Sequence, residues 1–129
     1  MSRRLRALEP ASEDLLNAVQ SKGRTINYAL PNSDELRYLD FMGANANVGG
    51  ENLTHILLRR DPRKVEVLEE FLHGAQKRIG LIDRIGVTAA ERHVKEFMIR
   101  HSELLKLAPE DMAILNRMLG DEHGNHRGV

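Results

Sequence analysis

Residues 61–85 have the sequence DPRKVEVLEEFLHGAQKRIGLIDRI, and this stretch determines the expected architecture. Its apolar residues fall on two neighbouring lines along a helix. The first line has the spacing 3-4-3-4-3 and the second lies beside it: Val65, Leu68, Leu72, Ala75, Ile79 and Ile82, then Val67, Phe71, Leu81 and Ile85. At about 100° per residue the two lines together cover about 200° of the helix surface. We therefore expect a central helix with neighbours on more than one side, and any break in it at His73-Gly74.

A second helix follows after a very short link. Gly86-Val87 predicts a tight turn, and Thr88 with Glu91 three residues later predicts a helix cap. The apolar repeat after this turn has the spacing 4-3-4-3-4, over Ala90, Val94, Phe97, His101, Leu104 and Ala108. Because the link is so short, the two helices should form an antiparallel hairpin. Two pairs of opposite charge at i,i+4 mark the side of this helix that we expect to face water, Glu91–Lys95 and Glu96–Arg100.

Shorter elements are predicted on either side of the hairpin. Ser12 and Asn32 are placed to cap helices over residues 13–22 and 33–42, and Pro109 opens a last helix that ends at Leu119. The glycine- and asparagine-rich segment 43–50 predicts a loop. Two segments leave alternatives open. Residues 24–30 alternate in polarity, which favours an extended segment without an obvious partner strand, and residues 53–58 fit a helix or a buried strand.

Together these patterns predict an all-α fold. We expect five or six helices around a central antiparallel hairpin, with a short extended segment near residues 24–30 as an alternative. The chain has 129 residues, which is the size of one domain. We expect a flexible basic arm at residues 1–11, a helical domain at residues 12–120 that the 43–50 loop could subdivide, and a flexible tail at residues 121–129.

The composition argues against several function classes. The chain has no cysteine, which excludes disulfides, thiolate chemistry and cysteine zinc sites. No apolar run is long enough to cross a membrane and no signal peptide is visible, so we expect a cytoplasmic protein without a membrane partner. Basic and acidic residues balance at 19 each, which argues against a dedicated nucleic-acid binder without excluding one.

No catalytic or ligand-binding motif stands out. We identify no ligand-type neighbour at a useful spacing for His73, and His123 and His126 lie in the predicted tail. Segment 43–50 lacks the Gly-Lys-Ser/Thr ending of a phosphate-binding loop. We therefore expect a non-enzymatic protein with no metal, no cofactor and no small-molecule substrate.

One local charge imbalance stands at the start of the central helix. We define the basic cluster as Arg59, Arg60, Arg63 and Lys64. Positive charge at the first turn of a helix opposes the helix dipole, so residues placed there at a local cost are candidates for contact with a negatively charged partner. The expected arm adds further candidate contacts in Arg3, Arg4 and Arg6.

These features favour a small protein–protein interaction module, which could be a regulator, an adaptor or a subunit of a larger assembly. The wide apolar arc of the central helix predicts self-association or a protein partner. The alternative is a nucleic-acid-binding protein that uses the basic cluster and the N-terminal arm.

Overall fold

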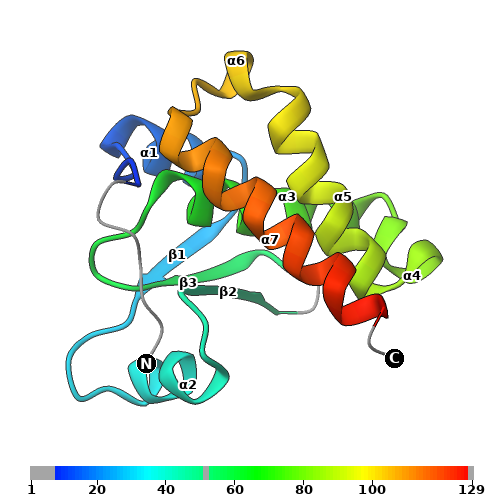
Figure 1. Cartoon of the computed structure of the whole chain (residues 1–129). Helices are drawn as coiled ribbons and strands as arrows, with labels where there is room; N and C mark the ends of the chain where they lie inside the picture. Colours follow the sequence, from blue (N-terminus) through cyan, green and yellow to red (C-terminus); the bar gives the residue numbers. More distant parts are fainter. Residues whose placement is uncertain (1–7, 51–52, 128–129) are drawn as a thin grey trace.

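The computed structural model describes residues 8–50 and 53–127, with side chains as far as residue 120. The predicted all-α fold is wrong, because a three-stranded sheet accompanies the helices. Figure 1 shows α3, α5 and α7 gathered on one side of the sheet and α2 on the other. In chain order the elements are α1 (Glu13–Ser21), β1 (Thr25–Tyr28), α2 (Asp34–Met42), β2 (Ala46–Gly49), β3 (His55–Leu58), α3 (Lys64–Arg78), α4 (Leu81–Ile85), α5 (Val87–Arg100), α6 (Ser102–Leu105) and α7 (Pro109–Arg127).

The sheet is mixed, with β3 in the middle of the order β1-β3-β2. β1 runs parallel to β3, with Ile26 opposite Ile56, and β2 runs antiparallel to β3, with Val48 opposite Ile56. Ile56 and Leu58 are fully buried and Ile26 is nearly so. The alternating segment near residues 24–30 is therefore a true strand, and its partner lies about thirty residues later in the chain.

The predicted loop at residues 43–50 contains strand β2. Glycine and asparagine are poor strand formers, so local sequence favours a loop here. Backbone pairing with β3 overrides that preference, since residues 46–49 form a continuous antiparallel ladder with residues 55–58. The same pairing decides the alternative left open for residues 53–58 in favour of a strand.

Helix α3 lies between two separate hydrophobic cores. Val65 and Leu68 belong to a core shared with α5 and α7, where Val94, Met98 and Leu115 are buried. Val67 belongs to a second core under the sheet, with Phe71 packed against it. The two lines of apolar residues on this helix thus contact different neighbours.

The helix predicted over residues 61–85 is interrupted, although not at Gly74. α3 ends at Arg78, and Gly80 takes a left-handed conformation at φ 75° before α4 begins. Gly74 stays inside α3, where it is buried. The second helix of the hairpin also stops early, because α5 ends at Arg100 and α6 follows.

Some predicted helix boundaries are displaced. Ser12 caps α1 as expected, whereas Ser33 rather than Asn32 caps α2. Thr88 caps nothing, because α5 already begins at Val87 after Gly86. α7 continues to Arg127, beyond the predicted end at Leu119.

The described part of the predicted arm packs against the fold. Leu8 is buried in the core that α3 shares with α5 and α7. The Lys64 amide donates to the Glu9 carbonyl at 2.8 Å, and the Ala11 amide donates to the Pro62 carbonyl at 2.9 Å. Arg3, Arg4 and Arg6 lie outside the described residues.

Candidate functional site

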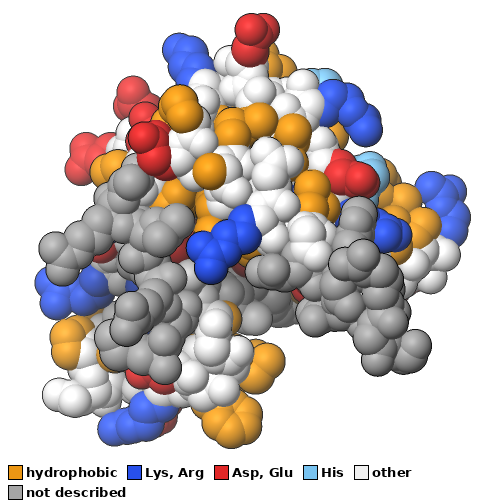
Figure 2. Space-filling model, viewed as in Figure 1, with side chains coloured by type: hydrophobic (Ala, Val, Ile, Leu, Met, Phe, Trp, Pro, Cys, Tyr) orange, Lys and Arg blue, Asp and Glu red, His pale blue; other side chains and the backbone are white. Residues whose placement is uncertain are grey.

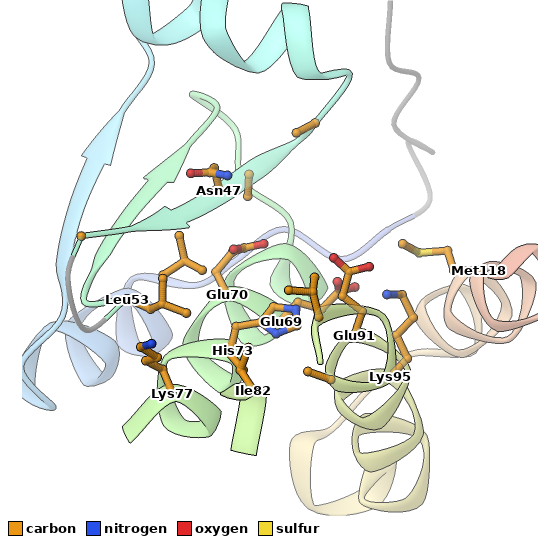
Figure 3. Close-up of a pocket in the computed structure, with 16 residues that line it drawn as sticks. Asn47, Leu53, Glu69, Glu70, His73, Lys77, Ile82, Glu91, Lys95 and Met118 are labelled. Carbon is orange, nitrogen blue, oxygen red and sulfur yellow. The ribbon is translucent and has the colours of Figure 1, made fainter. Parts of the chain in front are cut away.

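A cleft of about 630 Å³ opens between strand β2 and the helices α3 and α5 (Figure 3). Small and aliphatic residues such as Ala46, Val48 and Ala90 form part of its lining, and Met118 of α7 completes it. The polar and charged side chains that line it come from three elements: Asn47 from β2, then Glu69, Glu70, His73 and Lys77 from α3, and Glu91 and Lys95 from α5. This is a concentration of proton-transferring groups in a partly apolar cleft, as in many ligand sites.

The pitch of α3 explains why its polar residues share the cleft. His73 follows Glu69 by four positions and Glu70 by three, and both spacings bring side chains together on a helix surface. The apolar residues between them, Leu72 and Phe71, pack against the two cores. Figure 3 shows Glu69, Glu70 and His73 rising from this helix toward β2 and Asn47.

Glu70 has a strongly altered affinity for protons. Its pKa rises from 4.5 to about 8, chiefly because the side chain is buried and then because Glu69 and Glu91 are close. Lys95 works in the opposite direction. Burial and like charges both disfavour an ionised carboxylate, so Glu70 is mainly a protonated acid at neutral pH.

Lys95 lies inside the molecule rather than at its surface. The residue is only 3% exposed, while Glu91 one turn earlier is exposed at the cleft. The prediction that this i,i+4 pair faces water is therefore wrong for Lys95. An i,i+4 charge pair has the same sequence spacing whether it faces solvent or lines a cleft. The sequence pattern therefore could not distinguish the two cases.

Gln76 connects the cleft to helix α5. It is 4% exposed, and its side-chain Nε2 donates to the Ala90 carbonyl at 2.9 Å. The same Nε2 lies 3.1 Å from His93 Nδ1, and Gln76 Oε1 lies 2.9 Å from His73 Nδ1. The buried amide of Gln76 thus holds the His73 ring in place through its Nδ1 atom. Sequence analysis gave His73 no useful neighbour, yet Glu69, Glu70 and Gln76 all lie within about one turn of it.

Close packing holds this part of α3 in place. A Cβ on Gly74 would lie 2.7 Å from the Leu53 carbonyl oxygen and 3.0 Å from Arg24 Nε. Arg24 is buried and its guanidinium stacks over the Phe71 ring at 4.9 Å. Burial, and then the charge of Arg78, lower the pKa of Arg24. The helix therefore lies directly against the segment before β3.

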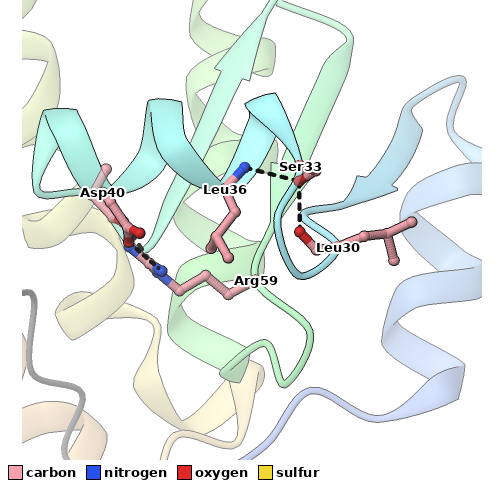
Figure 4. A network of polar contacts seen from close by, with 6 residues as sticks. Leu30, Ser33, Leu36, Asp40 and Arg59 are labelled. Carbon is pink, nitrogen blue, oxygen red and sulfur yellow. Dashed lines mark hydrogen bonds and ion pairs between the residues drawn. The ribbon is translucent and has the colours of Figure 1, made fainter.

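Most side chains of the basic cluster interact with other parts of the same chain. Arg59 forms an ion pair with Asp40 at 3.0 Å and donates to the Ala44 carbonyl, which joins β3 to α2 (Figure 4). Arg63 pairs with Asp61 at 3.2 Å. Lys64 donates to the Lys106 carbonyl at 2.8 Å. These three side chains are less than a fifth exposed.

Arg60 is the exposed member of the basic cluster. The cluster therefore does not present four cations to one partner surface in this structure. The Glu66 carboxylate accepts from the Arg63 amide at 2.9 Å and so caps the first turn of α3.

Exposed apolar residues lie on α2 and shortly before it in the chain. We define the α2 surface as five exposed residues from α2, the end of β1 and the segment between them: Tyr28, Leu30, Tyr38, Phe41 and Met42. Phe41 is 86% exposed. Figure 2 shows hydrophobic side chains at the lower end of the molecule, where Figure 1 places α2. Large apolar residues gathered in this way are typical of contact surfaces.

The described part of the chain shows neither a metal-binding group nor a membrane-spanning helix. Among the residues whose side chains are described, 8–50 and 53–120, no group of three or more histidine, cysteine or acidic residues is arranged to hold a metal ion. The same residues include no helix with the length and apolarity that a membrane span requires. Comparisons with protein-family models, curated proteins and solved structures found no match.

Proposed function

We propose that the chain is an enzyme that hydrolyses a small polar substrate in the cleft, with Glu70 as the general acid. The observation that carries this proposal is the cleft itself: the Glu70 carboxyl group, whose pKa burial raises to about 8, lies among ionisable neighbours on α3 and α5. Titratable groups whose environments push their pKa values apart are the usual basis of acid–base catalysis. This proposal departs from the non-enzymatic role that the sequence favoured, because the cleft residues come together only in the fold.

The reaction needs two proton transfers that balance each other. A base in the cleft takes a proton from water as the water oxygen forms a bond to the substrate. Glu70 gives its proton to the leaving atom as the old bond breaks. A positioned acid or base of this kind contributes about 10²–10⁴-fold in rate.

The charge of the cleft selects against anionic substrates. Apart from the protonated Glu70, two carboxylates line it, from Glu69 and Glu91, and the two cationic residues are Lys77 and Lys95. Lys77 lies 3.6 Å from the Asp83 carboxylate, so part of its charge is already balanced. An uncharged ester or glycoside therefore fits the cleft better than a phosphate.

The test is a panel of chromogenic substrates. We expect p-nitrophenyl esters or glycosides to be cleaved, and p-nitrophenyl phosphate to be a poor substrate. Glu70→Gln should lower kcat/KM by about 10²–10⁴-fold for methyl esters or methyl glycosides, whose leaving groups need a proton, and by much less for the p-nitrophenyl substrates. Glu96→Gln, on the exposed side of α5, is the matched control and should have no effect. An unchanged kcat/KM of Glu70→Gln for the methyl substrates would contradict the role of Glu70, and no hydrolysis of any substrate by the wild-type protein would contradict the proposed function.

A second candidate function is protein association through the α2 surface. The observation that favours it is the exposure of Phe41, Met42 and Leu30 on one end of the molecule. A second copy of the chain is the partner that we propose. Light scattering should show a dimer that Phe41→Ser converts to a monomer, whereas Ile79→Ser, an exposed apolar residue outside that surface, should leave the dimer intact. A monomeric wild-type protein at high concentration would contradict this role.

A further inference from the structure

The hydrogen bonds of Gln76 determine which nitrogen of His73 carries its proton. The Ala90 carbonyl can only accept, so the atom 2.9 Å from it must be the Gln76 amide nitrogen. That places the amide oxygen, which also only accepts, 2.9 Å from His73 Nδ1. His73 Nδ1 must therefore carry the proton, and in the neutral ring the basic lone pair is on Nε2.

The second hydrogen of the same amide determines the tautomer of His93. Gln76 Nε2 lies 3.1 Å from His93 Nδ1, so the remaining N–H is directed to His93 and the His93 Nδ1 atom accepts. The two histidines are consequently held in opposite tautomers by one buried side chain. A partner that fixes the tautomer of a histidine also fixes which nitrogen can act as the base.

We propose that His73 Nε2 is the base that takes the proton from water in the cleft, and that Gln76 is the positioning residue that sets the His73 tautomer. This inference rests on the proposed hydrolytic function and names the base that it needs. His73 lines the cleft together with Glu70, and it follows Glu70 by one helical turn. The base and the acid of the reaction therefore lie on the same rigid helix, which keeps their separation constant.

The tautomer can be measured directly in the wild-type protein. Long-range ¹H–¹⁵N NMR correlations distinguish Nδ1–H from Nε2–H in a neutral imidazole. We expect Nδ1–H for His73 and Nε2–H for His93, recorded in the same spectrum at a pH where both rings are neutral. Finding Nε2–H at His73 would overturn the inference.

Two substitutions of Gln76 separate positioning from packing. Gln76→Leu keeps the approximate volume but removes the acceptor, so the Nδ1–H preference of His73 should be lost and kcat/KM should fall, by up to about 10⁴-fold as for a histidine base in the wrong tautomer. Gln76→Glu keeps an acceptor oxygen for His73 Nδ1 but removes the N–H groups that donate to the Ala90 carbonyl and to His93, so the Nδ1–H of His73 should persist while the tautomer preference of His93 is lost. Loss of activity in Gln76→Leu with an unchanged His73 tautomer would overturn the positioning role.

The outcomes separate this inference from the function on which it rests. His73→Ala should lower kcat/KM for the p-nitrophenyl substrates by about 10²–10⁴-fold. If Glu70→Gln abolishes hydrolysis of the methyl substrates and His73→Ala does not, the function survives and His73 is not the base. If Gln76→Leu does not fold by circular dichroism, the wild-type tautomer and the His73→Ala rates still decide the question.

Discussion

Gly74 lies so close to Leu53 that a Cβ at position 74 would stand 2.7 Å from the Leu53 carbonyl oxygen. Backbone cannot yield as a flexible side chain can, so α3 would have to move away from the segment that leads into β3. We therefore expect Gly74→Ala to destabilise the fold by about 1–3 kcal/mol despite the better helix propensity of alanine. Urea unfolding measures this directly.

Gly120 offers the matched control for this substitution. It lies in α7 with nothing within 4 Å of an added Cβ, so Gly120→Ala should be neutral or stabilising by about 0.5–1 kcal/mol. Equal stability of the two alanine variants would show that α3 does not lie directly against Leu53.

The stability of the protein should depend on pH through Glu70. The pKa of Glu70 is about 8 in the folded protein and near its ordinary value when unfolded, so the folded state holds the extra proton between these two values. Stability from this group is therefore complete at low pH and is lost as pH rises from about 4.5 to about 8. Glu70→Gln removes the loss and should be more stable than wild type near pH 8.5 by about 2–4 kcal/mol.

Unfolding curves at several pH values test this dependence. Glu96→Gln, which changes an exposed carboxylate on α5, should follow the wild-type pH dependence. A Glu70→Gln variant whose stability parallels wild type across that pH range would mean that Glu70 ionises normally.

Two neighbouring arginines of the basic cluster should behave differently. Arg59→Ala removes the ion pair with Asp40 and the hydrogen bonds to the Ala44 carbonyl, so it should cost about 1–3 kcal/mol. Arg60 is exposed, and Arg60→Ala should stay within about 0.5 kcal/mol of wild type. Thermal melts compare the two, and similar losses would contradict the placement of Arg59.

Serine caps give a further comparison. Ser33 Oγ accepts from the Leu36 amide at 3.1 Å, so Ser33→Ala should destabilise the protein by about 0.5–2 kcal/mol. Thr88→Ala should change the stability little, because α5 begins at Val87 and Thr88 is therefore not its cap residue. A larger loss from Thr88→Ala than from Ser33→Ala would restore the helix boundary that the sequence suggested.

The sequence predicted much of the helical part of the fold and little of the sheet. Helical periodicity is local, so the apolar lines indicated a helix packed on two sides, although this helix covers Lys64–Arg78 rather than all of residues 61–85. Strand β2 contains only Ala46, Asn47, Val48 and Gly49, and its stability comes from pairing with β3 rather than from propensity. No local pattern can reveal such a partner.

The candidate site was missed for a related reason. Glu70 and Glu91 lie on different helices, and only packing of α3 against α5 brings them to one cleft. Part of the site was visible in the sequence. His73 lies three or four positions from Glu69, Glu70 and Gln76, and this spacing alone predicts neighbouring side chains on a helix. The basic cluster attracted attention by its composition, although three of its four side chains have partners within the chain.

The most direct test of the account is the titration of the Glu70 carboxyl group. Protein labelled with ¹³C-glutamate gives a side-chain carboxyl resonance for each residue, and Glu70→Gln identifies the one that belongs to position 70. The account predicts that this resonance titrates with a midpoint at about 8. A midpoint near the ordinary value of 4.5 would contradict the acid role of Glu70 and with it the proposed chemistry of the cleft.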